Sequence, residues 1–305
     1  MKKLAASILV LCLLFTTAFS AKADQDVFEF QRRIIFEYDP DIREYEFYVL
    51  TDEGTVFANE AGYKAHPEIR EWKDLVSLRV NWGIAAGLKK DGTVCVAVSN
   101  PKSRNLIAEA AQWKDIAQIV VCYESIYGLT KDNRIIYAGN DYNPDKDQKA
   151  KLAKSNEWGR IARIVGSLDL IAITDDGHVF STMPEDFSEL DHIGDVITDG
   201  FETDFLKDDG TNIMYTEWER GIGTFDVPDI HDICQITYFD GTRMARLTNN
   251  HEYIVPMYSS LESFTDPSIQ AISGFAWVDL EGVIHMDQNQ FGLEGVKLPR
   301  ISMNP

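Results

Sequence analysis

Cysteine is scarce in this sequence, and basic residues are far outnumbered by acidic ones. The 305 residues include four cysteines, and the three beyond the N-terminal segment are spaced too irregularly for a disulfide framework: Cys95, Cys122 and Cys234. We expect buried thiols that act as small apolar side chains, with a single bridge left open. The chain has 29 Lys and Arg against 49 Asp and Glu. Such an acidic surface repels phosphate groups, which argues against nucleic-acid and anionic-membrane binding and leaves basic or neutral partners.

The motifs of common catalytic and metal sites are also absent from the sequence. None of the six histidines has a zinc-site spacing, and no Gly-x-Ser-x-Gly nucleophile elbow or phosphate-binding glycine-rich loop occurs. A Ser-His-Asp triad stays open, because its members need not be neighbours, and a glycosidase pair is not assignable among 49 acidic residues. Catalysis has no positive support, so we predict that the chain is not an enzyme and holds no cofactor.

Long apolar runs are confined to the N-terminal segment. Two lysines precede an apolar run over residues 4–15 that is too short to span a bilayer comfortably, and small residues follow up to Ala23. We predict a signal peptide over residues 1–23, with Ser20 as the alternative cleavage point, and therefore secretion to the periplasm or the medium. Lipoprotein processing at Cys12 is disfavoured because Cys12 lies inside the apolar run, so we predict no membrane anchor.

The predicted mature chain, residues 24–305, is a large acidic domain. Removing 23 of 305 residues leaves 282, which is ample for a core, and removing three lysines leaves 26 basic against 49 acidic residues, a net charge of −23. Hydrophobic residues make up 45% of the sequence, which argues against disorder or a fibre.

A repeat organises this domain. Three segments share the pattern Trp-x-x-apolar-x-x-apolar: 72–78, 113–119 and 158–164. Weaker copies begin at Ile193, Ile230 and Ile269. The separation from the opening tryptophan to a later aspartate in a polar turn is 19 residues twice and 18 once. A register kept this closely indicates a structural repeat.

Each unit contains a hairpin signal, which is a turn-forming dipeptide between two apolar runs. Seven such turns occur: Glu53-Gly54, Asp91-Gly92, Asp132-Asn133, Asp176-Gly177, Asp209-Gly210, Asn249-Asn250 and Glu281-Gly282. Their mean spacing is 38 residues. The pattern predicts three strands in each unit, one after the opening segment, one into the turn and one out of it.

A unit of this size cannot bury both faces of its own sheet, so the units must stack, and closure into a ring also removes exposed sheet edges. The sequence therefore predicts an all-β fold, a seven-bladed β-propeller over residues 24–305, with six or eight blades left open. Helical signals occur only in connectors, at 106–112 and 149–154. The strand-like stretches 27–30 and 34–38 would complete the last blade and close the ring.

The motif Trp-Lys-Asp-Leu/Ile, followed by Gly-Leu-x-x-Asp-Gly/Asn-x-Val/Ile, resembles the regulator of chromosome condensation repeat in the form found in bacterial extracellular proteins. Residues 72–182 match well and 193–260 match loosely. The resemblance implies a seven-bladed propeller used as a recognition scaffold; one secreted relative of that architecture, a beta-lactamase inhibitor protein, binds another protein across one face. Where the family has a glycine nine residues after the opening segment begins, this chain has Asn81 and Cys122. The chromatin activities of the eukaryotic namesake are not implied, because predicted secretion and charge oppose them.

Two conspicuous residue patterns have a structural explanation. The opening tryptophans Trp72, Trp113 and Trp158 recur at one place of the repeat, so we expect them in the core between blades. The connector after residue 140 alternates oxygen-bearing side chains as a calcium loop does: Asp141, Asn143, Asp145 and Asp147. It lacks the glycine at the sixth and the glutamate at the twelfth position, so a solvated loop is the leading interpretation and calcium a weaker candidate.

One rim of the ring offers a candidate binding face. Residues eight positions beyond each turn share one end of the outgoing strands, and aromatic residues lie at or beside these positions: Tyr63, Tyr142, Trp218, Tyr258 and Phe291. Aromatic residues are enriched at binding hot spots, so this rim is a candidate for protein binding. The alternative is that these side chains cover connectors locally.

The first functional hypothesis is a secreted, monomeric, non-enzymatic scaffold that binds a protein or cell-surface ligand, preferentially a basic one, through loops on one face. The alternative is a propeller hydrolase that acts on extracellular polysaccharide with carboxylates in the central channel. A third hypothesis is a structural module of the cell envelope without a specific ligand.

Overall fold

The computed structural model describes most of the chain between residues 33 and 302. The described ranges are 33–39, 44–99, 104–140, 148–183, 187–198, 202–216, 221–223, 232–238, 244–248, 251–257, 260–273 and 275–302. The predicted signal peptide and the stretch 27–30 lie outside them and stay predictions.

The described residues form seven antiparallel sheets, which we number in chain order. Sheets 1 to 4 have three strands each. Sheet 1 contains β1 (Ile34–Asp39), β2 (Glu44–Leu50) and β3 (Val56–Ala58), and sheet 2 contains β4 (Leu75–Asn81), β5 (Ile84–Lys89) and β6 (Val94–Val98). Sheet 3 contains β7 (Ile116–Cys122), β8 (Ser125–Thr130) and β9 (Ile135–Gly139), and sheet 4 contains β10 (Ile161–Gly166), β11 (Leu170–Thr174) and β12 (Val179–Ser181). Sheet 5 contains β13 (Ile193–Thr198), β14 (Glu202–Lys207), β15 (Asn212–Thr216) and β16 (Gly221–Gly223). Sheet 6 contains β17 (Ile233–Tyr238), β18 (Met244–Thr248), β19 (Glu252–Met257) and β20 (Ser260–Thr265). Sheet 7 contains β21 (Ile269–Ser273), β22 (Ala276–Asp279) and β23 (Ile284–His285). The six predicted hairpin turns within the described ranges each join the second and third strands of one sheet, and the seventh, Asn249-Asn250, lies outside these ranges.

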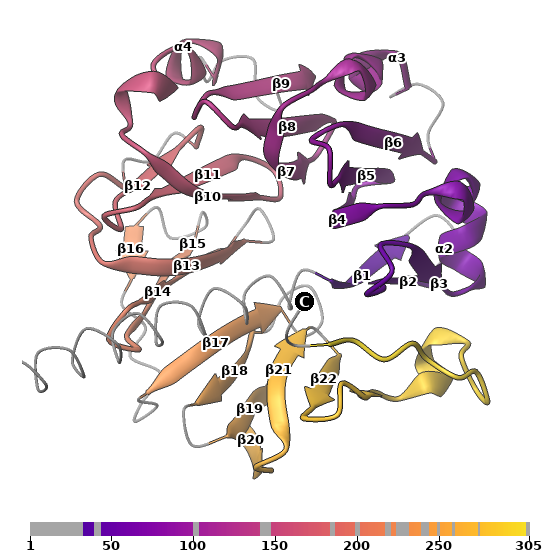
Figure 1. Cartoon of the computed structure of the whole chain (residues 1–305). Helices are drawn as coiled ribbons and strands as arrows, with labels where there is room; N and C mark the ends of the chain where they lie inside the picture. Colours follow the sequence, from indigo (N-terminus) through magenta and orange to yellow (C-terminus); the bar gives the residue numbers. More distant parts are fainter. Residues whose placement is uncertain are drawn as a thin grey trace, which may run out of the picture.

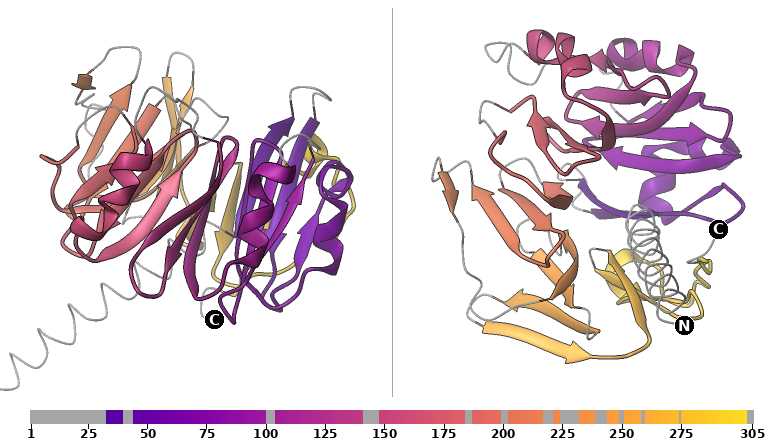
Figure 2. Two further views of the ribbon diagram at one scale, coloured as in Figure 1. Left: turned by 90° about the horizontal axis from the view of Figure 1, so that it is seen from above. Right: turned by 60° about the vertical axis from the view of Figure 1, so that its left-hand side comes forward.

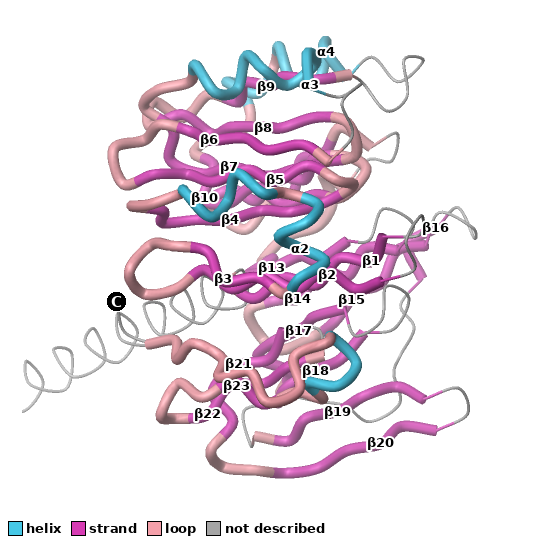
Figure 3. The backbone as a smooth tube through the Cα atoms, turned by 90° about the vertical axis from the view of Figure 1, so that its right-hand side faces the viewer, coloured by secondary structure: helices cyan, strands magenta, loops and turns pink. Residues whose placement is uncertain are grey.

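The sheets follow one another around a ring, with the first strand of each sheet nearest the centre (Figure 1). Short helices lie on the outer side of the ring, where the edge-on view of Figure 2 and the tube of Figure 3 show them. These are α2 (Glu60–Ala65), η1 (Pro67–Glu71), α3 (Arg104–Ile107), η2 (Ala108–Gln112), α4 (Gln148–Ala153), η3 (Ser155–Glu157) and η5 (Gln288–Phe291). The fold is a β-propeller, as predicted, and the helical signals predicted at 106–112 and 149–154 overlap α3, η2 and α4. No helix in the described ranges is long and apolar enough to cross a membrane.

Adjacent sheets are joined by hydrogen bonds between a hairpin turn and the first strand of the next sheet. The Leu75 amide donates to the Gly54 carbonyl (3.0 Å), and the Ile116 amide donates to the Gly92 carbonyl (3.1 Å). The same type of bond joins sheets 4 and 5 at Gly177. Gly177 has φ +80°, and a Cβ atom at this position would lie only 2.9 Å from the His192 Cα, so no larger residue fits. The turn glycines therefore both shape the hairpins and allow the next sheet to approach.

Two glutamine side chains add a second type of contact between sheets. Gln118 on β7 donates from Nε2 to the Ala162 carbonyl (2.6 Å), and its Oε1 accepts from the Ile164 amide (3.0 Å). Gln235 on β17 makes the same pair of bonds to β21, both at 2.9 Å. Each glutamine thus pairs with neighbouring backbone almost as an added strand residue would.

The ring closes by side-chain packing between sheets 1 and 7, which corrects the expectation for residues 34–38. These residues form β1, which pairs with β2 of sheet 1 and does not join sheet 7. The four-residue link between β1 and β2 makes this local hairpin the cheaper pairing, because it closes a short loop. β1 instead contributes Ile34 and Phe36 to an apolar cluster with sheet 7, where the Phe36 ring lies 4.9 Å from Phe291. Ser273 Oγ also donates to the Ile34 carbonyl across this boundary (2.9 Å).

The opening tryptophans pack against the repeat glycines. Trp72 and Trp113 are each 8% exposed, and a Cβ on Gly128 would lie 3.0 Å from the Trp113 ring. In the next copy the equivalent residue is Ala172, and there Trp158 is only half-buried and stacks on Phe180 (5.3 Å between centroids). The core placement of Trp72 and Trp113 is confirmed, while Trp158 packs at the margin of its cluster.

This packing makes a testable prediction for Gly128→Ala. The added methyl group crowds the Trp113 ring, so we expect the free energy of unfolding to fall by about 1–3 kcal/mol in chemical denaturation. In a strand without such a contact, replacing glycine by alanine raises stability by about 0.5–1 kcal/mol, and that result would contradict the packing described. Ala172→Gly is the matched control, and we expect it to cost about 1 kcal/mol or less.

Candidate functional site

Most of the site residues predicted from the sequence lie outside the described ranges. These are the calcium candidates Asp141, Asn143, Asp145 and Asp147, and the rim aromatics Tyr142, Trp218 and Tyr258. Their roles stay predictions. Among the described residues no group of three or more His, Cys, Asp or Glu side chains could hold a metal ion.

Tyr63 is described and packs within sheet 1 and its connector. Its ring is half-buried against a core cluster, its hydroxyl donates to the Val56 carbonyl (3.2 Å), and the Arg70 guanidinium lies 4.3 Å from the ring centre. These contacts agree with local covering, and its binding role stays a prediction. Phe291 is 3% exposed between sheets 1 and 7, so the expectation that it lies on the rim is wrong.

The two exposed aromatic residues among those described, Tyr38 and Trp82, both lie at or beside the turns between the first and second strands. We call this end of the ring the turn face; its described residues are 37–39, 44–45, 81–84, 122–125, 166–170, 198, 202, 238, 244, 273 and 275–276. The third strands end here as well, since the Ser99 amide donates to the Gly83 carbonyl (2.9 Å) and the Asn140 amide to the Glu124 carbonyl (3.3 Å). The turn face is therefore at the end of the ring where the sequence predicts a binding rim.

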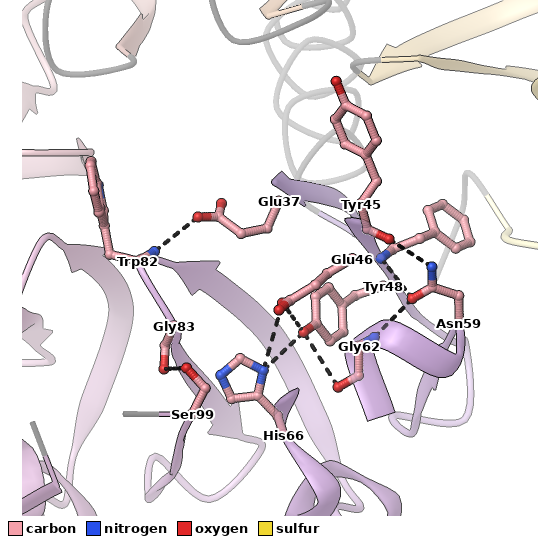
Figure 4. Close-up of polar contacts among 11 residues, drawn as sticks. Glu37, Tyr45, Glu46, Tyr48, Asn59, Gly62, His66, Trp82, Gly83 and Ser99 are labelled. Atoms are coloured by element: carbon pink, nitrogen blue, oxygen red, sulfur yellow. Dashed lines mark hydrogen bonds and ion pairs between the residues drawn. The ribbon is translucent and has the colours of Figure 1, made fainter. Parts of the chain in front are cut away.

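Trp82 is the main feature of the turn face. It lies in the two-residue turn Trp82-Gly83, has φ +50° and is 48% exposed. Its backbone amide donates to Glu37 Oε1 of sheet 1 (3.0 Å), as Figure 4 shows. A bulky residue in the left-handed region costs roughly 1–2 kcal/mol, and asparagine is the residue that suits this turn position best.

Neighbouring sheets support Trp82 from the other side. The Tyr123 ring of sheet 3 meets the Trp82 ring edge to face (5.2 Å between centroids, 71°). The Tyr123 amide donates to the Ser167 carbonyl of sheet 4 (2.7 Å), and Asn81 Nδ2 donates to the same carbonyl (3.3 Å). The turns of sheets 2 to 4, together with Glu37 on β1 of sheet 1, thus form one bonded surface around Trp82.

Sequence reasoning missed Trp82, although a signal exists. The Trp82-Gly83 dipeptide stands between two apolar runs, where a turn predicts asparagine or aspartate before the glycine. A tryptophan at such a place has no turn-forming role, so the ring itself requires an explanation.

The turn face is acidic as well as aromatic. Tyr38 is 47% exposed and its ring lies 5.0 Å from Tyr45. Exposed or half-buried carboxylates come from Glu37, Glu44 and Glu124. The described residues of the turn face include no Lys, Arg or His. Such a surface suits contact with a cationic partner.

A buried polar chain lies between sheet 1 and the Trp82 turn (Figure 4). Glu46, Tyr48 and His66 are 2%, 0% and 0% exposed. The Tyr48 hydroxyl contacts Glu46 Oε2 through a short hydrogen bond and lies 2.9 Å from His66 Nδ1. A carboxylate only accepts, so with an ionised Glu46 the hydroxyl donates to it and then accepts from His66 Nδ1–H.

This arrangement leaves His66 Nε2 as a buried atom without a hydrogen-bond partner among the described residues. Burial lowers the pKa of His66, and the nearby Gly83 carbonyl and Glu68 carboxylate offset that effect only in part. The Gly83 carbonyl already accepts from the Ser99 amide and hydroxyl (2.9 and 3.2 Å), so a proton on Nε2 would have to compete with both. The neutral ring is therefore the form that fits.

Solved structures resemble this fold at low sequence identity. The ectodomain of the receptor kinase CR4 from Physcomitrella patens is 8% identical with a TM-score of 0.55, covering 81% of this chain and 70% of that chain. Yeast RCC1 (Prp20) bound to Kap60 is 11% identical with a TM-score of 0.48, covering 77% and 74%. The β-propeller domain of Cps50 (Swd1) from Myceliophteria thermophila is 12% identical with a TM-score of 0.46, covering 84% and 97%. No protein-family model matches the sequence, and no curated protein matches it.

The buried histidine predicts a specific dependence of stability on pH. Because the pKa of His66 is lowered in the folded protein, the unfolded chain binds a proton that the folded chain does not, once the pH falls below about 6.5. Stability present above that pH is therefore lost on acidification, by at most about 1.4 kcal/mol per pH unit for one proton.

We expect the unfolding free energy of wild type to fall more steeply than that of His66→Gln between about pH 7 and about pH 5. Protonation of the turn carboxylates changes the unfolding free energy only at lower pH, below about pH 4, because hydrogen bonds such as that from Thr130 to Asp132 lower their pKa values. Parallel slopes for the two proteins across the upper window would show that His66 is not buried in the neutral form. A constant difference in unfolding free energy between the two proteins does not affect this comparison, because only the slopes against pH are compared.

Proposed function

We propose that this chain is a non-enzymatic binding scaffold that holds a protein partner on the turn face. The observation that carries the proposal is the exposed Trp82, kept in a costly backbone conformation and fixed by bonds to neighbouring sheets. Strained residues persist where the surrounding structure determines them, and they gather at sites of function. Tryptophan is also one of the residue types enriched at binding hot spots.

The ring geometry supports a scaffold in a second way. Cross-sheet bonds fix the turns of sheets 2 to 4, and one of them reaches Glu37 of sheet 1, so little conformational freedom remains to be lost on binding. A partner that spans several turns would gain contact area from sheets far apart in sequence. The net charge of −20 for the whole chain favours a basic partner and speeds its approach.

The proposal includes export and a monomeric state. The predicted signal peptide would bring the protein to the periplasm or the medium, where its partner would be a protein or a cell-surface component. Calcium at the loop 141–147 is a weaker part of the proposal, and a chelator would lower the unfolding midpoint if it is right.

One substitution, at Trp82, should weaken partner binding while leaving the stability of the fold nearly unchanged. We expect Trp82→Asn to keep the unfolding free energy within about 1 kcal/mol of wild type, because asparagine relieves the backbone while the contact with Tyr123 is lost. Recovery of partner from the protein's own culture medium or envelope extract, measured by quantitative pull-down, should fall by about tenfold or more.

The matched control is Leu280→Asn, which removes another exposed apolar side chain, 62% exposed, in the turn between β22 and β23 at the opposite end of the ring. We expect this variant to recover the partner as wild type does. Equal recovery by Trp82→Asn and wild type would reject the turn face as the binding surface.

A further inference from the structure

The exposed part of Trp82 has a defined chemical neighbourhood. Tyr123 meets its ring edge to face, which leaves about half of the tryptophan surface open to solvent (48%). The turn that carries Tyr123 also carries Glu124, whose Oε2 accepts from Asn140 Nδ2 (3.2 Å). Two aromatic rings and a positioned carboxylate thus belong to adjoining turns of sheets 2 and 3.

The charge of the surroundings selects the ligand. The described residues of the turn face supply the carboxylates of Glu37, Glu44 and Glu124 and no basic side chain. An anionic ligand would be repelled there, and a neutral apolar ligand would leave these carboxylates partly desolvated without a counter-charge. A cation gains from both the carboxylates and the negative face of the indole ring.

We propose that the open face of Trp82 and the Glu124 carboxylate bind an arginine or lysine side chain of the protein partner, an inference that rests on the proposed function. Arginine fits best, because its planar guanidinium stacks on an aromatic ring while its N–H groups reach a carboxylate. The bond from the Trp82 amide to Glu37 holds the Trp82 backbone in place before binding, and the bond from Asn140 to Glu124 holds the carboxylate.

The test uses N-acetylarginine amide as the probe and N-acetylcitrulline amide as its neutral counterpart of nearly the same shape. Binding is followed by the indole N–H signals of protein labelled with nitrogen-15 at tryptophan, and the signal missing in Trp82→Asn identifies Trp82. We expect the arginine probe to move the Trp82 signal to saturation with an affinity about three to five times that of the citrulline probe.

Two charge variants make the assignment specific. Glu124→Gln should weaken arginine binding about two- to threefold, whereas Glu281→Gln, an equal change of charge in an exposed turn at the other end of the ring, should leave it unchanged. Raised salt should weaken the arginine probe and not the citrulline probe.

Two results would overturn the inference: equal affinity for the two probes at Trp82, or arginine-dependent shifts confined to other tryptophans. The proposed function has its own test in the pull-down with Trp82→Asn. If partner recovery depends on Trp82 while the probes show no preference for arginine, the scaffold function stands and the cation site is wrong. If recovery does not depend on Trp82, the function itself is wrong.

Discussion

The whole structure depends on the fact that no single sheet can bury both of its faces. A three-stranded sheet of short strands becomes stable only when its neighbours cover it. The hydrogen bond from the Leu75 amide to the Gly54 carbonyl, repeated between other sheets, sets the distance and angle at which the next sheet packs. Packing of Phe36 on Phe291 between sheets 1 and 7 then closes the ring. Without that last boundary, two sheets would expose apolar faces.

The repeat could be predicted from the sequence because its signals are local. A turn dipeptide needs positive φ, and the recurring tryptophan needs a place in the core, so Gly54 and Trp113 follow from backbone and packing rules alone. The ring closure was missed because the pairing of β1 with β2 or with sheet 7 depends on a competition between loop length and distant packing. No residue pattern within 34–38 distinguishes the two outcomes.

The candidate site could not be predicted in the same way. Trp82 stands out in the sequence only as an odd choice before a glycine, and its contacts come from Glu37 and Tyr123 in two other sheets. His66 was assigned no role from its spacing, yet folding buries it beside Tyr48 and beneath the Trp82 turn. Both cases join residues distant in sequence, whose proximity only the closed ring creates. Local rules therefore recover the fold, whereas the proposed binding surface is a property of the assembled sheets.

The central claim is that a rigid ring presents one end to a protein partner. Hydrogen exchange of the full chain with and without the recovered partner tests it most directly, because the turns of the two ends alternate along the sequence. The account predicts slower exchange on binding at residues 81–84 and 122–125, with no change at the turns around Gly92 and Gly282. Protection confined to those opposite turns, or to the outer strands, would contradict it.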